Sequence, residues 1–449
     1  MRVYNYGEWA IALPTRSLLM KILSYKDAGY ERFVKKLNRQ AVPSVELYDT
    51  VAAIVADVKK LGNKALFDYT EKFDKLTLTA KTMFVTEAEL EEAEAQVEDS
   101  VKKAIEASRK NIHAFAKRSL RKDWKYKNTQ GAQVGERFVP YDRVGVYVPG
   151  GKAPLMSTAL MTAAFAQAAG VPEIVAATPA GTDGKVNPAL LYALKVSGAT
   201  QILKVGGAQA IAGLALGTKT IQPVEKIFGP GNSFVVEAKR QLVGAVSIDL
   251  LPGPSEVLII ADKSANPAFV AADLLAQAEH GGDSVVGFVT NSKGLLTKVQ
   301  KQIAVQQKKL SRGKYINEVL KKGTFGLVVK NLDEAVKICN VFAPEHLSLI
   351  VEDEDKWLDQ IRTAGAIYVG NFAAVAVGDF LAGPSHTLPT GGSGKSFSGI
   401  RADQFQRRTS IVRMDQKSVQ KSEPLVKEFA RVEGLDAHGA SVTIRANAK

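Results

Sequence analysis

The feature that most constrains the fold is an alternation of short apolar strands and helices that begins at Val144. The segment "VGVYV" (144–148) predicts a strand. It is followed by a Pro149-Gly150-Gly151 turn and a helix that runs to Gly170. Because strands that alternate with helices normally form a parallel sheet with helices on both faces, this region predicts a doubly wound α/β unit. Its later elements are expected as strands at 173–178 and 201–205 and a helix at 187–198.

A second alternation begins after "LPGPSE" (251–256) and predicts a second α/β unit. The segments "VLIIA", "SVVGFVT", "FGLVV", "LSLIV" and "AIYVG" predict its strands, with helices near 266–280, 294–309, 332–340 and 355–364. We therefore expect two α/β domains, one inserted into the other. The expected parts are an N-terminal arm at 1–39, a discontinuous catalytic domain at 40–144 and 255–400, an inserted domain at 145–254, and a helical, charged C-terminal tail at 401–449.

Two helices are expected before the first alternation. The segment "SVELYDTVAAIVADVKKLG" has an apolar stripe with a 3.6-residue period that ends at Gly62. A second helix begins at Thr86, where Glu89 completes a capping box, and is expected to reach about Phe115.

The charge balance raises the question of a polyanion partner. The chain has 59 Lys and Arg against 46 Asp and Glu, a net charge of +13. The densest basic segments, 117–127 and 306–314, lack the repeated aromatic residues of a single-strand binder, so a solvated basic surface is favoured over a nucleic-acid site. No apolar run approaches the roughly 20 residues of a membrane span, and no clear signal sequence is present. We expect a cytoplasmic protein with no nucleic-acid or membrane partner.

The histidines indicate where the chemistry lies. Only five are present, and four stand beside a carboxylate or an amide at helix ends or in loops. His280 follows Gln277 by three residues, which places both on one helix face. Read alone, this pair favours a helix cap over a metal site. The other three of these four histidines favour a metal site instead, because imidazole and carboxylate groups together bind a cation such as zinc well. They occur as Glu345-His346, Asp379 with His386, and Glu433 with His438.

The remaining histidine and the single cysteine have simpler interpretations. His113 lies in the second expected helix and is read as a surface or packing residue. Because Cys339 is the only cysteine, the chain can form neither an intramolecular disulfide nor a metal site made of several thiolates, which fits a reducing compartment. It lies in the apparent helix "LDEAVKICNVF" and is read as a small packed side chain.

Eight segments in order resemble the motifs of histidinol dehydrogenase over about residues 40–445. They are "RVGVYVPGGKAPLMST", "GGAQAIAGLALGT", "KIFGPGN", "DLLPGPSEVLIIAD", "LAQAEHGGDS", "APEHL", "GDFLAGPSHTLPTGG" and "EGLDAHGAS". The resemblance implies a zinc-dependent, NAD-linked homodimer with two incomplete Rossmann-like domains. Such an enzyme oxidises L-histidinol to L-histidine through the aldehyde, in two hydride transfers that end histidine biosynthesis.

The resemblance also implies roles for individual residues. One Zn²⁺ per subunit would be held by Gln277, His280, Asp379 and His438, with His438 supplied by the neighbouring subunit. Glu345 and His346 match the catalytic acid–base pair. The substrate-contacting positions would be Ser255, Gln277, His280, His346, Asp379, His386, Glu433 and His438. The NAD⁺-contacting positions would be Tyr147, Gln209 and Asn232.

This chemistry suits the residue types. A neutral imidazole is a competent base at neutral pH, so His346 is expected to accept protons during both oxidations. Without a thiol nucleophile, water must add to the aldehyde, and Glu345 is expected to activate that water. The metal would orient the imidazole and amine of histidinol.

Two departures from the family pattern and one weak motif keep alternatives open. Ser385 precedes His386 where the family usually has Asn, and Ala373-Ala374 replaces a Ser/Thr-Pro pair. The loop "PGGKAP" after 144–148 lacks the G-x-G-x-x-G pattern, so its glycines could equally be structural. A related zinc- and NAD-dependent dehydrogenase of another small alcohol, such as sulfopropanediol, remains the alternative.

Overall fold

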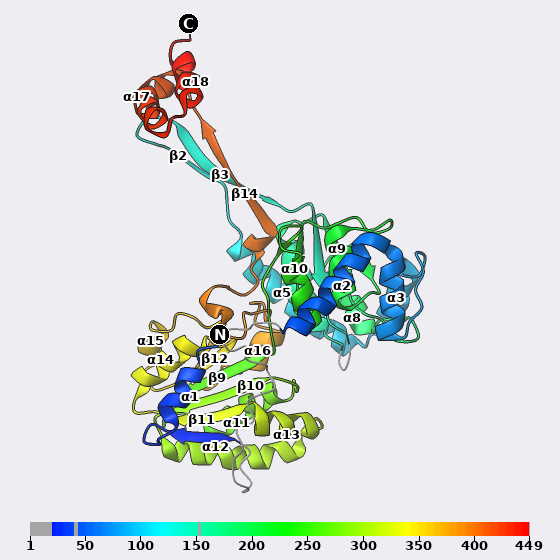
Figure 1. Cartoon of the computed structure of the whole chain (residues 1–449). Helices are drawn as coiled ribbons and strands as arrows, with labels where there is room; N and C mark the ends of the chain where they lie inside the picture. Colours follow the sequence, from blue (N-terminus) through cyan, green and yellow to red (C-terminus); the bar gives the residue numbers. More distant parts are fainter. Residues whose placement is uncertain (1–19, 40–43, 151–153, 449) are drawn as a thin grey trace.

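The computed structural model describes residues 20–39, 44–150 and 154–448. Two α/β domains are stacked, and a narrow arm projects from the upper one and ends in two helices (Figure 1). Gly151 of the expected turn, residues 1–19 of the expected arm, residues 40–43 and Lys449 lie outside the described ranges.

The first domain contains a six-stranded sheet in which every neighbouring pair is parallel. Its order is β1 (Lys21–Ser24), β11 (Thr324–Val328), β10 (Val285–Thr290), β9 (Glu256–Ala261), β12 (His346–Ile350) and β13 (Ala366–Val369). One face is covered by α1 (Tyr30–Lys36), α14 (Leu332–Phe342) and α15 (Glu354–Leu358). The other face is covered by α11 (Pro267–Ala278), α12 (Lys293–Gln306), α13 (Gly313–Lys322) and α16 (Val375–Phe380).

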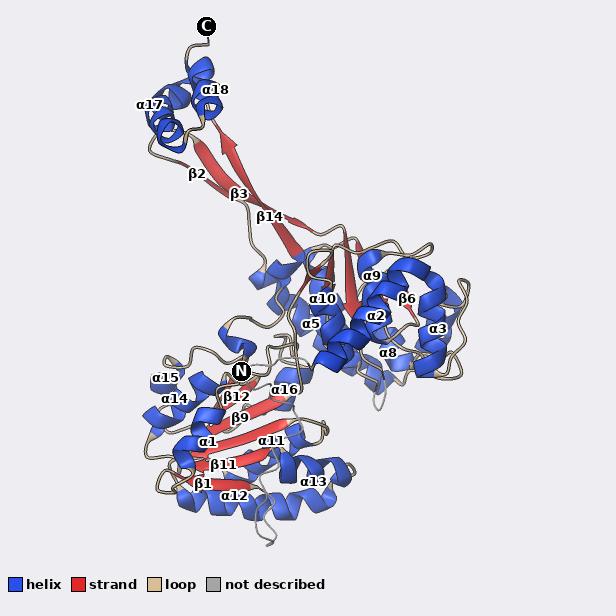
Figure 2. Ribbon diagram, viewed as in Figure 1, coloured by secondary structure: helices blue, strands red, loops and turns tan. Residues whose placement is uncertain are grey.

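The second domain contains a five-stranded parallel sheet (Figure 2). Its order is β6 (Gln201–Leu203), β5 (Glu173–Ala177), β4 (Arg143–Tyr147), β7 (Lys226–Phe228) and β8 (Ser247–Ile248). One core holds α2 (Val45–Leu61), α3 (Asn63–Asp74), α9 (Gly207–Leu216) and α10 (Ser233–Gln241). The opposite core holds α4 (Glu87–Gln96), α5 (Asp99–Ser119), α6 (Met156–Ala159), the π-helical turn Leu160–Ala164, α7 (Phe165–Ala169) and α8 (Pro188–Val196).

The expected domain boundaries need correction. The assignment of 40–144 to the catalytic domain is wrong, because Val51 and Ile54 of α2 pack in one core with Ile211 and Leu214 of α9. The inserted domain therefore includes α2 to α5. The irregular arm expected at 1–39 is also wrong for its described part, since β1 and α1 belong to the six-stranded domain. A periodic apolar stripe shows that a helix is buried, but it does not show which sheet covers it.

The arm is a three-stranded antiparallel sheet that ends in a helical pair. Its order is β14 (Gln406–Arg413), β3 (Gln133–Pro140) and β2 (Trp124–Lys127), followed by α17 (Gln416–Glu433) and α18 (Asp436–Ala446). The tail helices are confirmed, but β14 was missed. Short 3₁₀ turns lie at Gln307–Lys309, Ser393–Lys395 and Ala402–Phe405.

Local helix signals gave mixed results. Ser44 caps α2, which ends at Leu61 before Gly62, as expected. The Thr86–Glu89 capping box is confirmed. The long helix expected to run to Phe115 is instead two helices, because the chain is extended at Val97. Across the described ranges, none of the helices has the length and apolar character needed to cross a membrane.

Candidate functional site

Glu345 and His346 lie at the amino-terminal end of β12, beside the start of β9. Both side chains are almost fully buried, at 8% and 5% exposure. Their partner is the main chain of Glu256. Its N–H donates to Glu345 Oε2 at 2.7 Å, and its carbonyl oxygen lies 2.9 Å from His346 Nδ1. A proton on Nδ1 satisfies that carbonyl, which leaves Nε2 for proton transfer.

His346 Nε2 points toward a second acid. It lies 3.2 Å from Asp379 Oδ1, although neither atom makes a hydrogen bond of good geometry within the chain. Burial alone would lower the pKa of His346, but Glu345 and Asp379 outweigh it and raise that pKa. Burial raises the pKa of the Glu345 carboxyl. The free chain therefore favours a protonated imidazole, whereas a general base must be neutral when it accepts a proton.

Asp379 lies among three imidazoles. Burial opposes its ionisation, but His346, His386 and His280 outweigh that effect and lower the pKa of Asp379. His280 directly follows the last turn of α11, and its N–H donates to the Gln277 carbonyl at 3.3 Å. Gln277 is 4% exposed, and its side-chain Nε2 is buried without a partner. Unpartnered buried polar atoms on Gln277, Asp379 and His346 are the feature expected of a site that binds a polar ligand or a cation.

The fourth expected metal ligand lies elsewhere. His438 is on α18 and Glu433 ends α17, both at the tip of the arm, far from α11 and α16 (Figure 1). Within the described ranges, no three His, Cys, Asp or Glu side chains are arranged to hold a metal ion. One chain thus brings Gln277, His280 and Asp379 to one region and leaves His438 remote from them.

His386 connects this region to the second domain. Its Nδ1 lies 2.9 Å from the Asp379 carbonyl oxygen, and its Nε2 lies 3.3 Å from Thr158 Oγ1. The preceding Ser385 hydroxyl donates to the Met161 carbonyl at 3.0 Å and is buried. Ser385, one of the departures from the family pattern, therefore has a contact between the domains. Ser255 directly precedes Glu256, the first residue of β9, whose main chain binds Glu345 and His346.

The three expected cofactor residues line one cavity. The cavity has a volume of about 700 Å³, and Tyr147, Gln209 and Asn232 all contribute to its wall. It opens where β4 ends and α9 and α10 begin, the edge at which parallel α/β sheets usually bind ligands. The Tyr147 hydroxyl accepts a hydrogen bond from Gly207 N at 3.0 Å, and Asn232 caps α10.

A buried ion pair supports this cavity. Lys239 and Asp249 are fully buried and in contact, and both bind the main chain of Gly229. Gly229 has φ of +111°, and an added Cβ would lie 2.2 Å from the Tyr147 carbonyl oxygen, so only glycine fits there. The Lys239–Asp249 pair therefore fixes the loop before Asn232.

Comparison with known proteins identifies the family. The family model described as histidinol dehydrogenase matches residues 37–446. The chain belongs to the histidinol dehydrogenase family. It is 41% identical to histidinol dehydrogenase from Xylella fastidiosa over 430 residues, covering 95% of this chain and 99% of that one. The protein of the same name from Heliobacterium mobile is 38% identical, with 95% and 99% covered.

A solved structure agrees. Histidinol dehydrogenase from Elizabethkingia anophelis matches with a TM-score of 0.91 and 36% identity, covering 96% of this chain and 99% of that one. The expected α/β fold with parallel sheets is confirmed. So is the expectation of an oxidoreductase, and membership of the histidinol dehydrogenase family supports histidinol oxidation in histidine biosynthesis.

Three charged residues that lie at these two sites were not identified from the sequence. Asp74 lines the cavity with one carboxylate oxygen buried and unpartnered. Glu256 and Arg39 form an ion pair next to Glu345 and His346. A charged residue that opens an otherwise apolar strand, as in "SEVLIIA", was a signal that could have identified Glu256. No local pattern marked Arg39 or Asp74.

Proposed function

We propose that this chain catalyses the NAD-dependent, zinc-requiring four-electron oxidation of L-histidinol to L-histidine through L-histidinal. The observation that carries the proposal is the Glu345–His346 pair, buried and bound to the Glu256 main chain, with Asp379 next to His346. Two titratable groups held at fixed positions in a closed environment are suited to successive proton transfers.

His346 acts in both oxidations. Its Nε2 takes the hydroxyl proton of the alcohol while the carbinol hydride leaves, which forms the aldehyde. After it releases that proton to solvent, it takes a proton from the aldehyde hydrate as a second hydride leaves, which forms the carboxylic acid, and this ionises to the carboxylate. NAD⁺, when bound, is the hydride acceptor in each step, and Tyr147, Gln209 and Asn232 would hold it in the cavity.

Glu345 supplies the water step. Its carboxylate removes a proton from the water that adds to the aldehyde carbon and returns a proton to the former aldehyde oxygen, and the resulting hydrate is the substrate of the second oxidation. A thioester route is disfavoured, because Cys339 is 0% exposed in the core around α14 and burial raises the pKa of its thiol. Only its thiolate would attack a carbonyl efficiently.

The residues present fit a zinc ion in part. Gln277, His280 and Asp379 would supply three ligands from one chain, with buried polar atoms that lack partners on two of them. Zinc, when bound, would position the imidazole and amine of histidinol and would reduce the attraction of Asp379 for the proton on His346. Gln277 and His280 then orient the substrate against His346.

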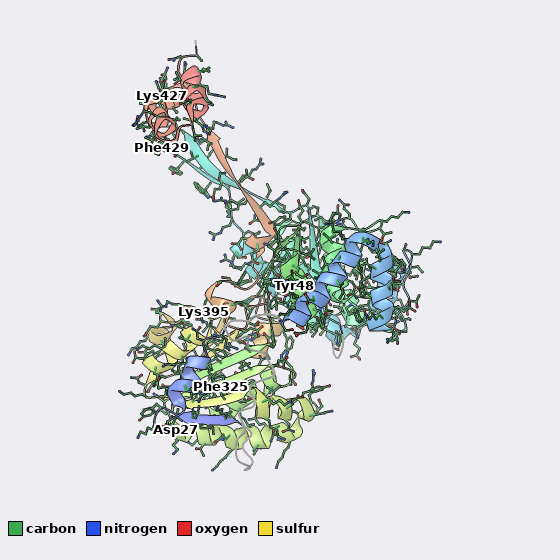
Figure 3. All side chains as sticks on the ribbon, in the orientation of Figure 1. Asp27, Tyr48, Phe325, Lys395, Lys427 and Phe429 are labelled. Carbon is green, nitrogen blue, oxygen red and sulfur yellow. The ribbon has the colours of Figure 1, made fainter. Side chains whose placement is uncertain are left out.

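The remaining ligand requires a second subunit. We infer a homodimer with shared sites, in which Glu433 and His438 reach the site of the partner subunit. The arm tip supports this, because Phe429, Val432 and Ile444 are 70–71% exposed there, and Figure 3 shows Phe429 on the tip. Exposed apolar groups of this size normally mark an interface. Phe372, three residues before α16, is 91% exposed and offers apolar surface near the start of the helix that carries Asp379.

The alternative substrate is another small alcohol such as sulfopropanediol. The observations that favour it are Ser385, which is turned toward Met161, and Ala373-Ala374, which directly precede α16. No nucleic-acid or membrane partner is part of the proposal, and the cytoplasm is the expected location of such a biosynthetic enzyme.

The first test is the yield of NADH per L-histidinol consumed, with and without a chelator. Two NADH per histidinol, lost on chelation and restored by zinc, is the expected result. One NADH would contradict the role of Glu345 or show that the aldehyde escapes. A zinc-loaded dimer without turnover would favour the alternative alcohol.

A further inference from the structure

Arg39 and Glu256 form an ion pair beside the catalytic residues. Arg39 Nη2 donates to Glu256 Oε2 at 3.0 Å, and Nη1 contacts the other oxygen. The two side chains are 13% and 3% exposed. The guanidinium also lies 3.7 Å from the ring centre of Phe342 and donates to the Phe342 carbonyl at 3.2 Å. This paired, stacked geometry is specific to arginine.

The main chain of Glu256 makes a hydrogen bond with each member of the proposed catalytic pair. Its N–H donates to Glu345 Oε2 at 2.7 Å, and its carbonyl lies 2.9 Å from His346 Nδ1. Its side chain also accepts a hydrogen bond from Gly391 N at 3.1 Å. The position of one residue therefore sets the orientation of both the proposed base His346 and the proposed water-activating carboxylate Glu345.

Arg39 neutralises the buried carboxylate of Glu256. Glu256 is buried next to another buried acid, Glu345, and within the described ranges Arg39 is its ion-pair partner. A buried charge that loses its partner costs far more than a buried pair neutralised on both sides. Without Arg39, the Glu256 side chain would turn toward water and displace the start of β9, to which both catalytic side chains are bonded.

We propose that Arg39 is a positioning residue, which neutralises Glu256 and thereby holds the main-chain groups that orient Glu345 and His346. The inference rests on the proposed roles of Glu345 and His346. Arg39 contacts neither of them directly, and the double variant separates its effect through Glu256 from its contacts with Phe342.

The test compares Arg39→Gln, Glu256→Gln and the double variant as zinc-loaded dimers. Arg39→Gln should lower kcat for histidinal oxidation by up to about 100-fold, because small misplacements of catalytic groups have effects of that size. KM for NAD⁺ should be unchanged, since the cavity at Tyr147 belongs to the other domain. Adding Glu256→Gln should restore most of kcat, because it removes the unpaired charge and keeps the same main chain.

A matched control is Arg240→Gln. On α10 of the other domain, Arg240 also makes a two-pronged contact with a buried glutamate, through its Nε and Nη2 to Glu237, whose side chain is 2% exposed. It should alter stability without altering kcat. The proposal is wrong if Arg39→Gln lowers only the melting temperature, as is expected of Arg240→Gln. It is also wrong if the double variant does not regain kcat. A crystal structure of Arg39→Gln should also show a longer His346 Nδ1 to Glu256 O distance than 2.9 Å.

The wild type separates this inference from the proposed function. Failure of the wild type to oxidise histidinol would overturn the function itself. An active wild type that is impaired by His346→Asn but not by Arg39→Gln would overturn only the role of Arg39.

Discussion

His346 and Asp379 approach each other from β12 and α16, with Nε2 and Oδ1 3.2 Å apart. The other ring nitrogen is engaged with the Glu256 carbonyl. The imidazole is thus held at Nδ1, and Nε2 is the ring nitrogen left to exchange a proton with a substrate. This geometry makes His346 the group whose loss should affect both oxidations.

His346→Asn should reduce kcat for histidinol and for histidinal alike, by about 10²- to 10⁴-fold, the usual contribution of a general base. Asparagine keeps a donor for the Glu256 carbonyl but has no titrating nitrogen. The measurement is steady-state kcat with each substrate supplied separately. His113→Asn is the control. Both His113 and its hydrogen-bond partner Gln167 belong to the domain that does not contain His346, so this change should leave both oxidations intact. Full retention of either step would exclude His346 as the common base.

Glu345→Gln should chiefly slow the aldehyde step. Glutamine still accepts the hydrogen bond from Glu256 N but cannot remove a proton from water. Histidinal should accumulate, and the yield should fall toward one NADH per histidinol. Trapping the aldehyde with a carbonyl reagent measures this directly. A loss confined to the alcohol step would contradict the assignment.

The fold was predictable where one segment carries its own signal. Most strands of the two parallel sheets are apolar runs, although the short β1, β7 and β8 were not predicted, and helices such as α2 and α8 have clear caps at Ser44 and Asn187. The domain boundaries were not predictable. The stripe of Val51 and Ile54 fits any apolar sheet, and β1 is only four residues long. Which sheet each joins depends on contacts far along the chain.

The candidate site was also predictable only where its residues are close in sequence. Glu345 and His346, and Gln277 and His280, are close in sequence, so their proximity was visible before the structure. The contact of His346 with Asp379 was not, since it depends on how α16 packs beside β12. Arg39 was missed for a similar reason: its partner Glu256 lies 217 positions away in the chain.

Asp273 lies on α11, one turn before Gln277, and Asp273→Asn should stabilise the metal-free protein in a pH-dependent manner. Burial, with a smaller effect from Asp379, raises the pKa of Asp273 to about 6. A folded-state pKa above the unfolded value gives stability that is complete below the ordinary carboxyl range and is lost as pH rises to about 6. Asparagine has no such loss. Melting temperatures should therefore match near pH 4 and favour the variant above pH 6. A constant difference across this range would show that Asp273 ionises normally.

His438→Asn should release zinc, although His438 lies at the far end of the arm from Asp379 in one chain. Metal content per subunit measures the loss. If sites are shared, refolding a mixture of His438→Asn and Asp379→Asn subunits creates mixed dimers with one intact site each. Because half of the dimers are then mixed, about a quarter of the wild-type activity should return. A mixture of Gln277→Ala and Asp379→Asn should recover none, since both ligands come from the same chain. Equal recovery in the two mixtures, or none in either, would mean that His438 does not complete the partner's site.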